Sequence, residues 1–277
     1  MTIEYDSSSK RSIWEAAKTL TGRSLRQATS IEHSDNVSHK GDLGTLVENY
    51  FFLINPGNSP EPDFPEAGLE LKTTGLLRHA ARKWRAKERL VLSMINYEEI
   101  VKESWSTASL LKKCSSMLIL FYEYIKGQSV IDRKFVLEPK LYELPEEDLP
   151  QIQKDWEVIR DKVRAGKAHE LSEGDTYYLG ACRKGSGGVN EALRVQPFST
   201  IKAKSRAFSF KQGYVDVILQ NHMTNLSSIV ESPGMTIEEA TNLKFRNFIG
   251  KTICGNGMVS TTSRRQHGRT GKHYSKR

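Results

Sequence analysis

The sequence predicts a mixed α/β (α+β) domain in which helices flank a mixed central β-sheet. Three patterns lead to this prediction. Residues 69–72 alternate apolar and charged side chains, as a strand does, and residues 89–97 and 117–125 are apolar runs of strand length. Apolar residues also recur at helical spacing in 41–54 and 150–165. A helical N-terminal part therefore leads into a sheet, and further helices follow.

The first elements are helices. Ser12 and Glu15 have the spacing of a capping box, which predicts a helix that runs toward Gly22. The helix expected over 41–54 would bury a single apolar stripe. It must end before 55–60, because the prolines of that segment cannot continue a helix.

The later elements are shorter. A basic, glycine-rich turn over 183–188 is expected to follow one of the strands. The remaining segments that we expect to be regular are strands at 135–144, 177–182 and 207–210, and a helix at 214–222.

Several classes of protein are excluded by what the sequence lacks. No apolar run approaches the roughly 20 residues of a membrane span, and the N-terminus does not resemble an export signal, so we expect a cytoplasmic protein without membrane contact. The three cysteines, Cys114, Cys182 and Cys254, are too far apart to suggest a disulfide framework or a zinc site. Neither a Gly-x-Ser-x-Gly elbow nor a phosphate-binding loop of the Gly-x4-Gly-Lys-Ser/Thr type is present.

The net charge of +8 is unevenly distributed. Nine of the 41 basic residues follow Glu239, after which no acidic residue occurs, so the basic residues before it nearly balance the 33 acidic ones. We expect a domain over 1–250 and a basic, disordered tail over 251–277. Local basic clusters at 72–87 and 183–211 are candidates for contact with nucleic acid.

The residues best suited to chemistry are Asp63, Glu70 and Lys72. Glu70 and Lys72 share one face of the predicted strand, and the prolines on either side of the Asp63–Phe64 dipeptide restrict the backbone near the first carboxylate. Two carboxylates could hold Mg²⁺, which polarises a scissile phosphate, and an ammonium could orient water or screen charge. The same pattern also fits a solvated strand face.

Glu48 offers a third carboxylate. It lies beside the apolar stripe of the 41–54 helix, and Gly44, one turn earlier, would let a nucleic-acid backbone approach. A third carboxylate would suit a second metal ion. Taken alone, a glutamate such as Glu48 is more often a surface residue of a helix.

An ordered series of motifs resembles the MutH family of mismatch-repair endonucleases and, more closely, the related type II restriction enzymes that cut at GATC. The resemblance covers residues from about 10 to 225, which makes it far more specific than the three residues alone. The segments that carry it are 40–48, 62–73, 87–98, 121–127, 167–174 and 201–208.

This resemblance implies a restriction-endonuclease-like PD-(D/E)xK fold and Mg²⁺-dependent cleavage of duplex DNA on the 5′ side of the G of GATC. By position, Asp63 and Glu70 match metal ligands, and Glu48 matches the additional carboxylate that we assign to the metal site. Lys72 matches the catalytic lysine, and Lys87 matches a further lysine near the scissile phosphate.

The resemblance also implies residues that approach DNA. Lys40 is one, and Lys184 is another, on a loop that enters the major groove, where arginine and lysine can donate to guanine. The full DNA-binding set that we expect is Lys40, Arg183, Lys184, Gly185, Lys202, Lys204 and Arg206.

Three functions stay open. The residues of the motifs favour a restriction enzyme. The length favours a MutH-like nickase of hemimethylated GATC, because restriction members carry a second domain and we expect this chain to be too short to form one. A non-catalytic GATC-binding module is the third. Self-association on DNA and a mismatch-repair protein are the other partners considered.

Overall fold

The computed structural model describes residues 4–29, 31, 43–55, 59–185 and 193–230. These residues form strands β1 (Glu70–His79), β2 (Lys83–Ala86), β3 (Leu90–Met94), β4 (Ser116–Glu123), β5 (Lys140–Glu143), β6 (Leu179–Arg183) and β7 (Arg206–Phe210). The α-helices are α1 (Lys10–Lys18), α2 (Leu25–Ala28), α3 (Leu43–Val47), α4 (Tyr97–Ile100), α5 (Ser109–Cys114), α6 (Leu149–Arg164) and α7 (Gln212–Val230). Short 3-10 or π-helical turns join them.

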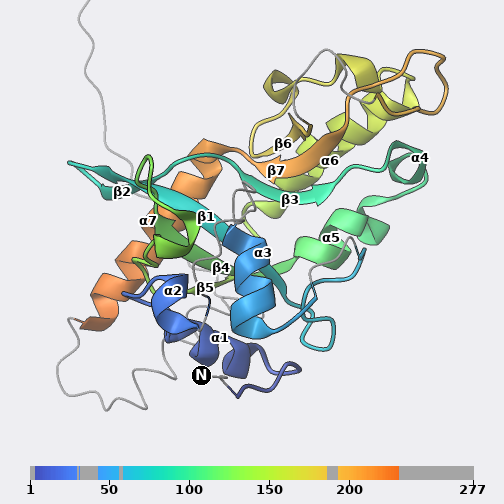
Figure 1. Ribbon diagram of the computed structural model, residues 1–277. Helices are drawn as coiled ribbons and strands as arrows, with labels where there is room; N and C mark the ends of the chain where they lie inside the picture. The colour runs from blue at the N-terminus through green and yellow to red at the C-terminus, as the bar shows by residue number, and fades with distance from the viewer. Residues whose placement is uncertain (1–3, 30, 32–42, 56–58, 186–192, 231–277) are drawn as a thin grey trace, which may run out of the picture.

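The strands form two sheets. The first has the order β2-β1-β4-β5, with β1 parallel to β4 and the outer pairs antiparallel. The second has the order β3-β7-β6 and is antiparallel throughout. Figure 1 shows β6, β7 and α6 gathered at one end of the molecule and α1, α2 and α3 at the other. The predicted mixed α/β architecture is confirmed.

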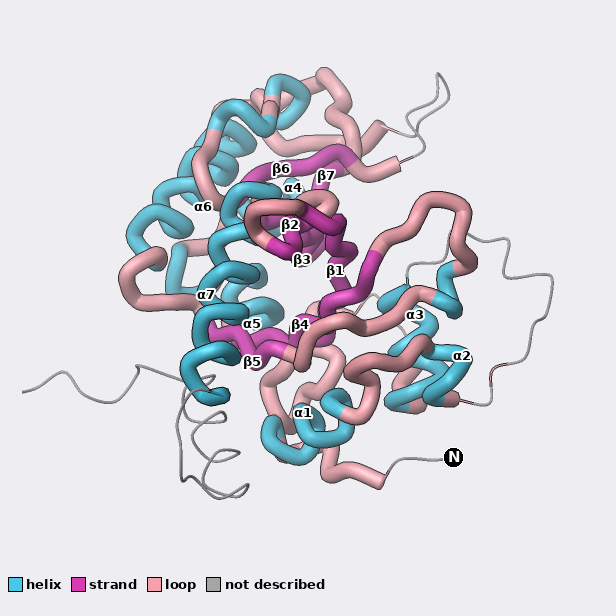
Figure 2. The backbone as a smooth tube through the Cα atoms, turned by 90° about the vertical axis from the view of Figure 1, so that its left-hand side faces the viewer, coloured by secondary structure: helices cyan, strands magenta, loops and turns pink. Residues whose placement is uncertain are grey.

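Strands β1 and β4 separate two hydrophobic cores. Met117, Ile119 and Phe121 of β4 face a core that also receives α6, α7 and the second sheet. Leu118 and Leu120 face the other core, which receives α1 and α3. Because successive side chains of a strand point to opposite faces, one apolar run can serve both cores. Figure 2 shows the strands between α6 and α7 on one side and α2 and α3 on the other.

Several predicted elements differ in extent. The strand expected over 135–144 is confined to β5, because Pro139 has no N–H to donate to a ladder. The strand expected over 89–97 ends at Met94, since the side chain of Asn96 accepts a hydrogen bond from the N–H of Glu98 and caps α4. The final helix is longer than the predicted 214–222.

The first helix begins earlier than predicted. Ser9, rather than Ser12, caps α1, and its side chain accepts a hydrogen bond from the N–H of Ser12. Gly22 adopts a left-handed conformation after this helix, with φ of +81°. The expected tail over 251–277 lies outside the described residues. No helix in the described part of the chain is both long and apolar enough to cross a membrane.

Candidate functional site

A short hairpin explains the spacing between Asp63 and Glu70. Phe64 and Leu69 exchange two backbone hydrogen bonds, with N···O distances of 3.0 and 3.1 Å. Gly68 adopts a left-handed φ of +60° in the turn between them. Phe64 is almost fully buried, which anchors the hairpin in the core. Because Phe64 and Leu69 pair, the next residues outward, Asp63 and Glu70, lie opposite each other.

A hydrogen bond links Asp63 and Glu70 across the hairpin. The backbone N–H of Asp63 donates to Oε2 of Glu70 at 3.2 Å. Oδ2 of Asp63 in turn accepts a hydrogen bond from the backbone N–H of Leu71 at 2.9 Å. Each carboxylate thus accepts a hydrogen bond from a backbone N–H.

Lys72 completes the predicted group. Glu70 and Lys72 share one face of β1, and Nζ of Lys72 lies 2.5 Å from Oε1 of Glu70. The side chain of Glu70 is 2% exposed and that of Lys72 16%. The sequence predicted a half-exposed strand here, but β1 lies between β2 and β4 and is covered on both faces.

A second lysine, which the sequence analysis missed, reaches the same carboxylate. Nζ of Lys113 lies 3.6 Å from Oε1 of Glu70 and donates to the carbonyl oxygens of Ser59, at 2.9 Å, and Glu61, at 3.3 Å. Lys113 belongs to α5, which directly precedes β4. Parallel pairing sets Glu70 opposite Met117, so the segment that leads into β4 lies beside the start of β1. The basic pair Lys112–Lys113 before a predicted strand was the available signal.

These contacts change the acid–base properties of the group. Burial raises the pKa of Glu70, and the nearby carboxylate of Asp63 raises it further, whereas Lys72 and Lys113 oppose the rise. Burial on its own would lower the pKa of Lys72, but the adjacent Glu70 carboxylate outweighs it, so the pKa of Lys72 is raised. Lys72 therefore keeps its proton at neutral pH.

The cysteine next to this group is buried and unreactive. Burial, opposed in part by the charge of Lys72, raises the pKa of the Cys114 thiol to about 12. At neutral pH Cys114 is a neutral thiol, so it supplies neither a nucleophile nor a thiolate ligand.

Glu48 begins a π-helical turn, Glu48–Phe52, that continues α3 and ends at Leu53 with a left-handed φ of +56°. Turns of this type are rare and occur frequently at functional sites. Among the described residues, however, no group of three or more His, Cys, Asp or Glu side chains is placed to hold a metal ion. Glu48 is therefore not joined to Asp63 and Glu70 as a three-carboxylate group.

Asp63 and Glu70 by themselves fit a hard divalent cation. Mg²⁺ is usually held by one or two carboxylates, with water and substrate phosphate as the other ligands. The two carboxylates lie side by side, and the two lysines offset part of their charge. The donor set therefore agrees with Mg²⁺ and offers no soft ligand that would select another metal.

Lys87 is not brought to this group. Its backbone N–H donates to the carbonyl oxygen of Gly75, five residues along β1 from Glu70, or about 16 Å at the usual rise of a strand. Its Nζ pairs with Glu88 at 3.0 Å and lies 4.4 Å from the centroid of the Tyr124 ring. The position next to Glu70 that the resemblance led us to expect for Lys87 is occupied by Lys113.

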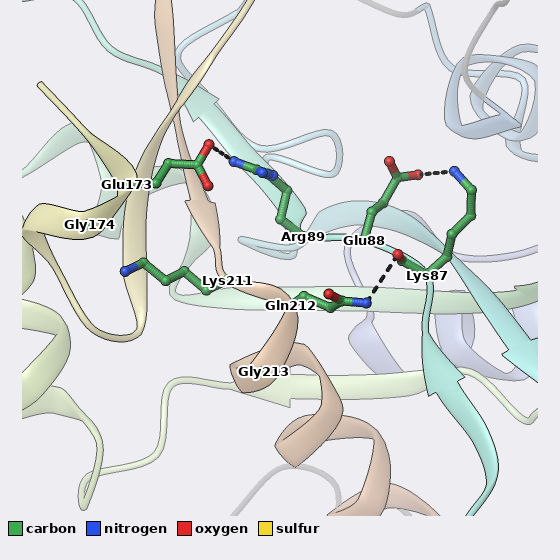
Figure 3. Close-up of a pocket in the computed structure, with 8 residues that line it drawn as sticks. All are labelled: Lys87, Glu88, Arg89, Glu173, Gly174, Lys211, Gln212 and Gly213. Carbon is green, nitrogen blue, oxygen red and sulfur yellow. Dashed lines mark hydrogen bonds and ion pairs between the residues drawn. The ribbon is translucent and has the colours of Figure 1, made fainter. Parts of the chain in front are cut away.

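Lys87 instead lines an open pocket of about 620 Å³. Figure 3 shows two ion pairs at this pocket, one between Arg89 and Glu173 and one between Lys87 and Glu88. None of Asp63, Glu70 or Lys72 is among the residues that line it, which are Lys87, Glu88, Arg89, Glu173, Gly174, Lys211, Gln212 and Gly213.

Arg206 is buried, in contrast to the exposed DNA contact that was expected. Its side chain is only slightly exposed, and its guanidinium donates to the carbonyl oxygens of Ala181, at 2.5 Å, and Leu171. It lies directly opposite Arg183 in the β6–β7 pair. Burial lowers the pKa of Arg206, but its partners are all protein groups, so it holds β6 and β7 together.

The other predicted DNA-binding residues lie at the end of β6 and before β7. The backbone N–H of Lys184 donates to the carbonyl oxygen of Ser205 at 2.8 Å, which brings the two segments together. The members of this group are Arg183 and Gly185, which are exposed, Lys184, which is half-buried, and Lys202 and Lys204, which are exposed. Lys40 lies outside the described residues.

Comparison with known proteins identifies two kinds of relative. A family model described as "DNA mismatch repair enzyme MutH" matches residues 52–155. The chain is 40% identical over 256 residues to the type II restriction enzyme Sau3AI of Staphylococcus aureus, an alignment that covers 88% of this chain and 50% of that enzyme. The chain therefore spans about half the length of this restriction enzyme.

Alignments with MutH proteins are weaker in identity but cover more of the relative. The chain is 25% identical over 221 residues to MutH of Serratia proteamaculans, covering 77% of this chain and 93% of that protein. With MutH of Citrobacter koseri it is 25% identical over 214 residues, covering 74% and 89%. The resemblance stated from the motifs is confirmed, and the fold is the restriction-endonuclease-like fold of the MutH family.

Proposed function

We propose that this chain, a relative of MutH and of the restriction enzyme Sau3AI, is a Mg²⁺-dependent endonuclease that cuts duplex DNA at GATC, 5′ of the G. One observation carries the proposal: Asp63 and Glu70 lie opposite each other at the start of β1, with Nζ of Lys72 2.5 Å from Glu70. A motif that could have been a solvated strand face is instead a buried, charged group. The choice of GATC is supported by the motif resemblance.

In this proposal the carboxylates of Asp63 and Glu70 hold the metal ion. When bound, the ion supplies Lewis-acid polarisation of the scissile phosphate and lowers the pKa of its water. The backbone bonds that orient both carboxylates supply a site formed in advance. Glu48, which is not part of this pair, is proposed to act in a supporting role from the neighbouring π-helical turn.

Lys72 and Lys113 are proposed to have different roles. Lys72, which keeps its proton, is proposed to stabilise the negative charge that develops on the phosphate, and it is not a general base. Lys113, held by the carbonyl oxygens of Ser59 and Glu61, is proposed to keep Glu70 ionised and is therefore a positioning residue.

The proposal is tested by Lys72→Ala, measured both for binding and for cutting of a GATC duplex. We expect cutting with Mg²⁺ to fall about a hundredfold or more, because one preorganised charge is lost, while binding in EDTA stays near that of the wild type. Lys154→Ala, on the exposed face of α6, is the control and should change neither cutting nor binding. Unchanged cutting by Lys72→Ala, or cutting by the wild type in EDTA, would refute the mechanism.

A MutH-like nickase is the second candidate, favoured by alignments that cover about nine-tenths of the MutH proteins. Unmethylated, hemimethylated and fully methylated duplexes separate the two. At low enzyme concentration a restriction enzyme yields double-strand breaks, whereas a nickase yields nicked product on hemimethylated DNA. Should Lys72→Ala and the wild type bind GATC equally and both fail to cut with Mg²⁺, the third candidate, a binding module, is favoured.

A further inference from the structure

Residues 193–204, between the Lys184 region and β7, form a loop, here called the ribbon, whose two arms are joined by a single antiparallel β-bridge. Arg194 and Ala203 exchange two backbone hydrogen bonds, with N···O distances of 2.7 and 2.8 Å. Ala203 and Gln196 are buried, so they define the inner face of the ribbon. Phe198 lies in the turn at its tip. No role was assigned to the tip from the sequence.

The ribbon is held firmly on the body of the protein. The side-chain oxygen of Gln196 accepts a hydrogen bond from the N–H of Ala168 at 2.7 Å, and its nitrogen lies 3.0 Å from Nδ1 of His169. Gly166 has a left-handed φ of +71°, and a Cβ there would lie 2.5 Å from the carbonyl oxygen of Phe198. The tip therefore rests directly on backbone, and its position is set by close packing.

The outer surface of the ribbon is apolar and basic. Phe198 is 75% exposed and Val195 is 65% exposed, and Leu193 and Ile201 are also exposed. Phe198 has a φ of +61°, a conformation that a bulky residue rarely adopts, so the fold accepts a backbone cost to present this ring to solvent. Lys202 and Val195 are both exposed and lie next to the Arg194–Ala203 bridge.

The charge around the ribbon indicates what it contacts. Between Asp175 and Asp216 the only acidic residue is Glu191, against seven basic residues. Lys202 forms no ion pair within the described ranges. The ribbon also continues directly from the Lys184–Ser205 hydrogen bond at the end of β6. A rigid surface that combines exposed apolar side chains with unbalanced positive charge is complementary to base edges and sugars flanked by phosphates.

We propose that the 193–204 ribbon is a second DNA-contacting element, in which Lys202 binds a phosphate and Phe198 packs against the duplex outside GATC. The inference rests on the proposed function. Phe198 is seven residues from Ser205, so the tip can lie at most about 23 Å from the Lys184 region. This upper limit corresponds to about seven base pairs at 3.4 Å each, so it does not confine the tip to the four base pairs of the site.

The test uses the full chain in EDTA, with a duplex of about 30 base pairs that carries one central GATC and a duplex of about 8 base pairs. Phe198→Ser should weaken binding to the long duplex about tenfold and change binding to the short duplex, which also carries GATC, little, because the short one has only about two base pairs on each side of the site. Lys202→Gln should lower the slope of log affinity against log salt by about 0.9 on the long duplex.

Matched controls are available. Tyr177→Ser removes an equally exposed aromatic ring at the other end of β6, and Lys154→Gln removes an exposed lysine of α6; both should bind like the wild type. Melting followed by circular dichroism is the check that each variant is folded.

The outcomes are distinguishable. If the wild type binds and cuts but Phe198→Ser and Lys202→Gln match it in affinity and salt slope, the ribbon inference is wrong and the proposed function stands. If the wild type neither binds nor cuts GATC DNA, the proposed function is wrong, and the ribbon inference that rests on it is wrong as well. If Phe198→Ser leaves DNA affinity unchanged but converts a dimer to a monomer in sedimentation, the ribbon contacts a second copy of the chain, and the inference is overturned.

Discussion

At the scale of single residues, Glu70 is the centre of the candidate site. It is buried, it lies next to a second carboxylate, and two lysines offset the resulting cost. An isolated ionised carboxylate would be expensive to bury, and the two lysines oppose the rise in the pKa of Glu70 that burial causes.

Lys113→Met provides a test at this scale. Lys113 lowers the pKa of Glu70, so its removal should raise that pKa further. Because Glu70 must be ionised to hold the metal, the acidic limb of the profile of log kcat/KM against pH should move to higher pH. Lys112→Met is the control, since Lys112 is exposed and pairs with Glu61. Equal profiles for the two variants would contradict the role of Lys113.

At the scale of elements, two connections build the site. The hairpin of Phe64 and Leu69 aligns Asp63 with Glu70, and the parallel pairing of β1 with β4 brings the end of α5 to the same point. Both depend on burial, because Phe64, Leu69 and the β4 side chains belong to the cores. The active geometry is therefore coupled to folding of the core.

Gly68→Ala tests the hairpin. Gly68 has a φ of +60°, and a Cβ there would meet no atom within 4 Å, so the expected cost of about 1 kcal/mol comes from backbone strain alone. We expect the free energy of unfolding to fall by this amount, as measured in urea, and cutting to fall more than binding as Asp63 moves. Gly213→Ala is the matched control, because Gly213 lies in α7 with open space and without a left-handed φ. A rise in stability for Gly68→Ala would show that the turn has another conformation.

At the scale of the whole molecule, the paired carboxylates and the exposed basic residues lie in different parts of the fold. The carboxylates lie at the start of β1, in the first sheet, whereas the exposed residues Arg183, Lys202 and Lys204 belong to the second sheet and its connection. Substrate that bridges the two would be held by one and cut by the other. This division agrees with phosphate contacts that position DNA and a separate group that performs chemistry.

Metal binding should be visible in the stability of the whole chain. Mg²⁺ at about 100 times its dissociation constant should stabilise the folded state by about 2.7 kcal/mol, which raises the Tm by several degrees. Glu70→Gln should abolish this rise in Tm, because one of the two proposed ligands is lost. Glu66→Gln, an exposed carboxylate of the same hairpin, should retain it. A Tm that rises equally in both variants would place the metal elsewhere.

The sequence by itself determined the residues that are close along the chain. The alternation at 69–72 predicted a strand with Glu70 and Lys72 on one face, and the motif series predicted the family resemblance and the fold. These depend on local periodicity and on contiguous residues, both of which can be read directly. Lys40 and the tail lie outside the described residues, so their predicted roles stay predictions.

Tertiary structure alone decided which distant residues join them. Lys113 reaches Glu70 because β1 and β4 pair in parallel, and Lys87 is displaced because it follows β2, whose pairing carries it along β1. Arg206 and Glu70 are buried by layers that no short segment specifies. Strand order and register result from packing across the whole chain, so the lysine beside Glu70 could not be chosen from spacing alone.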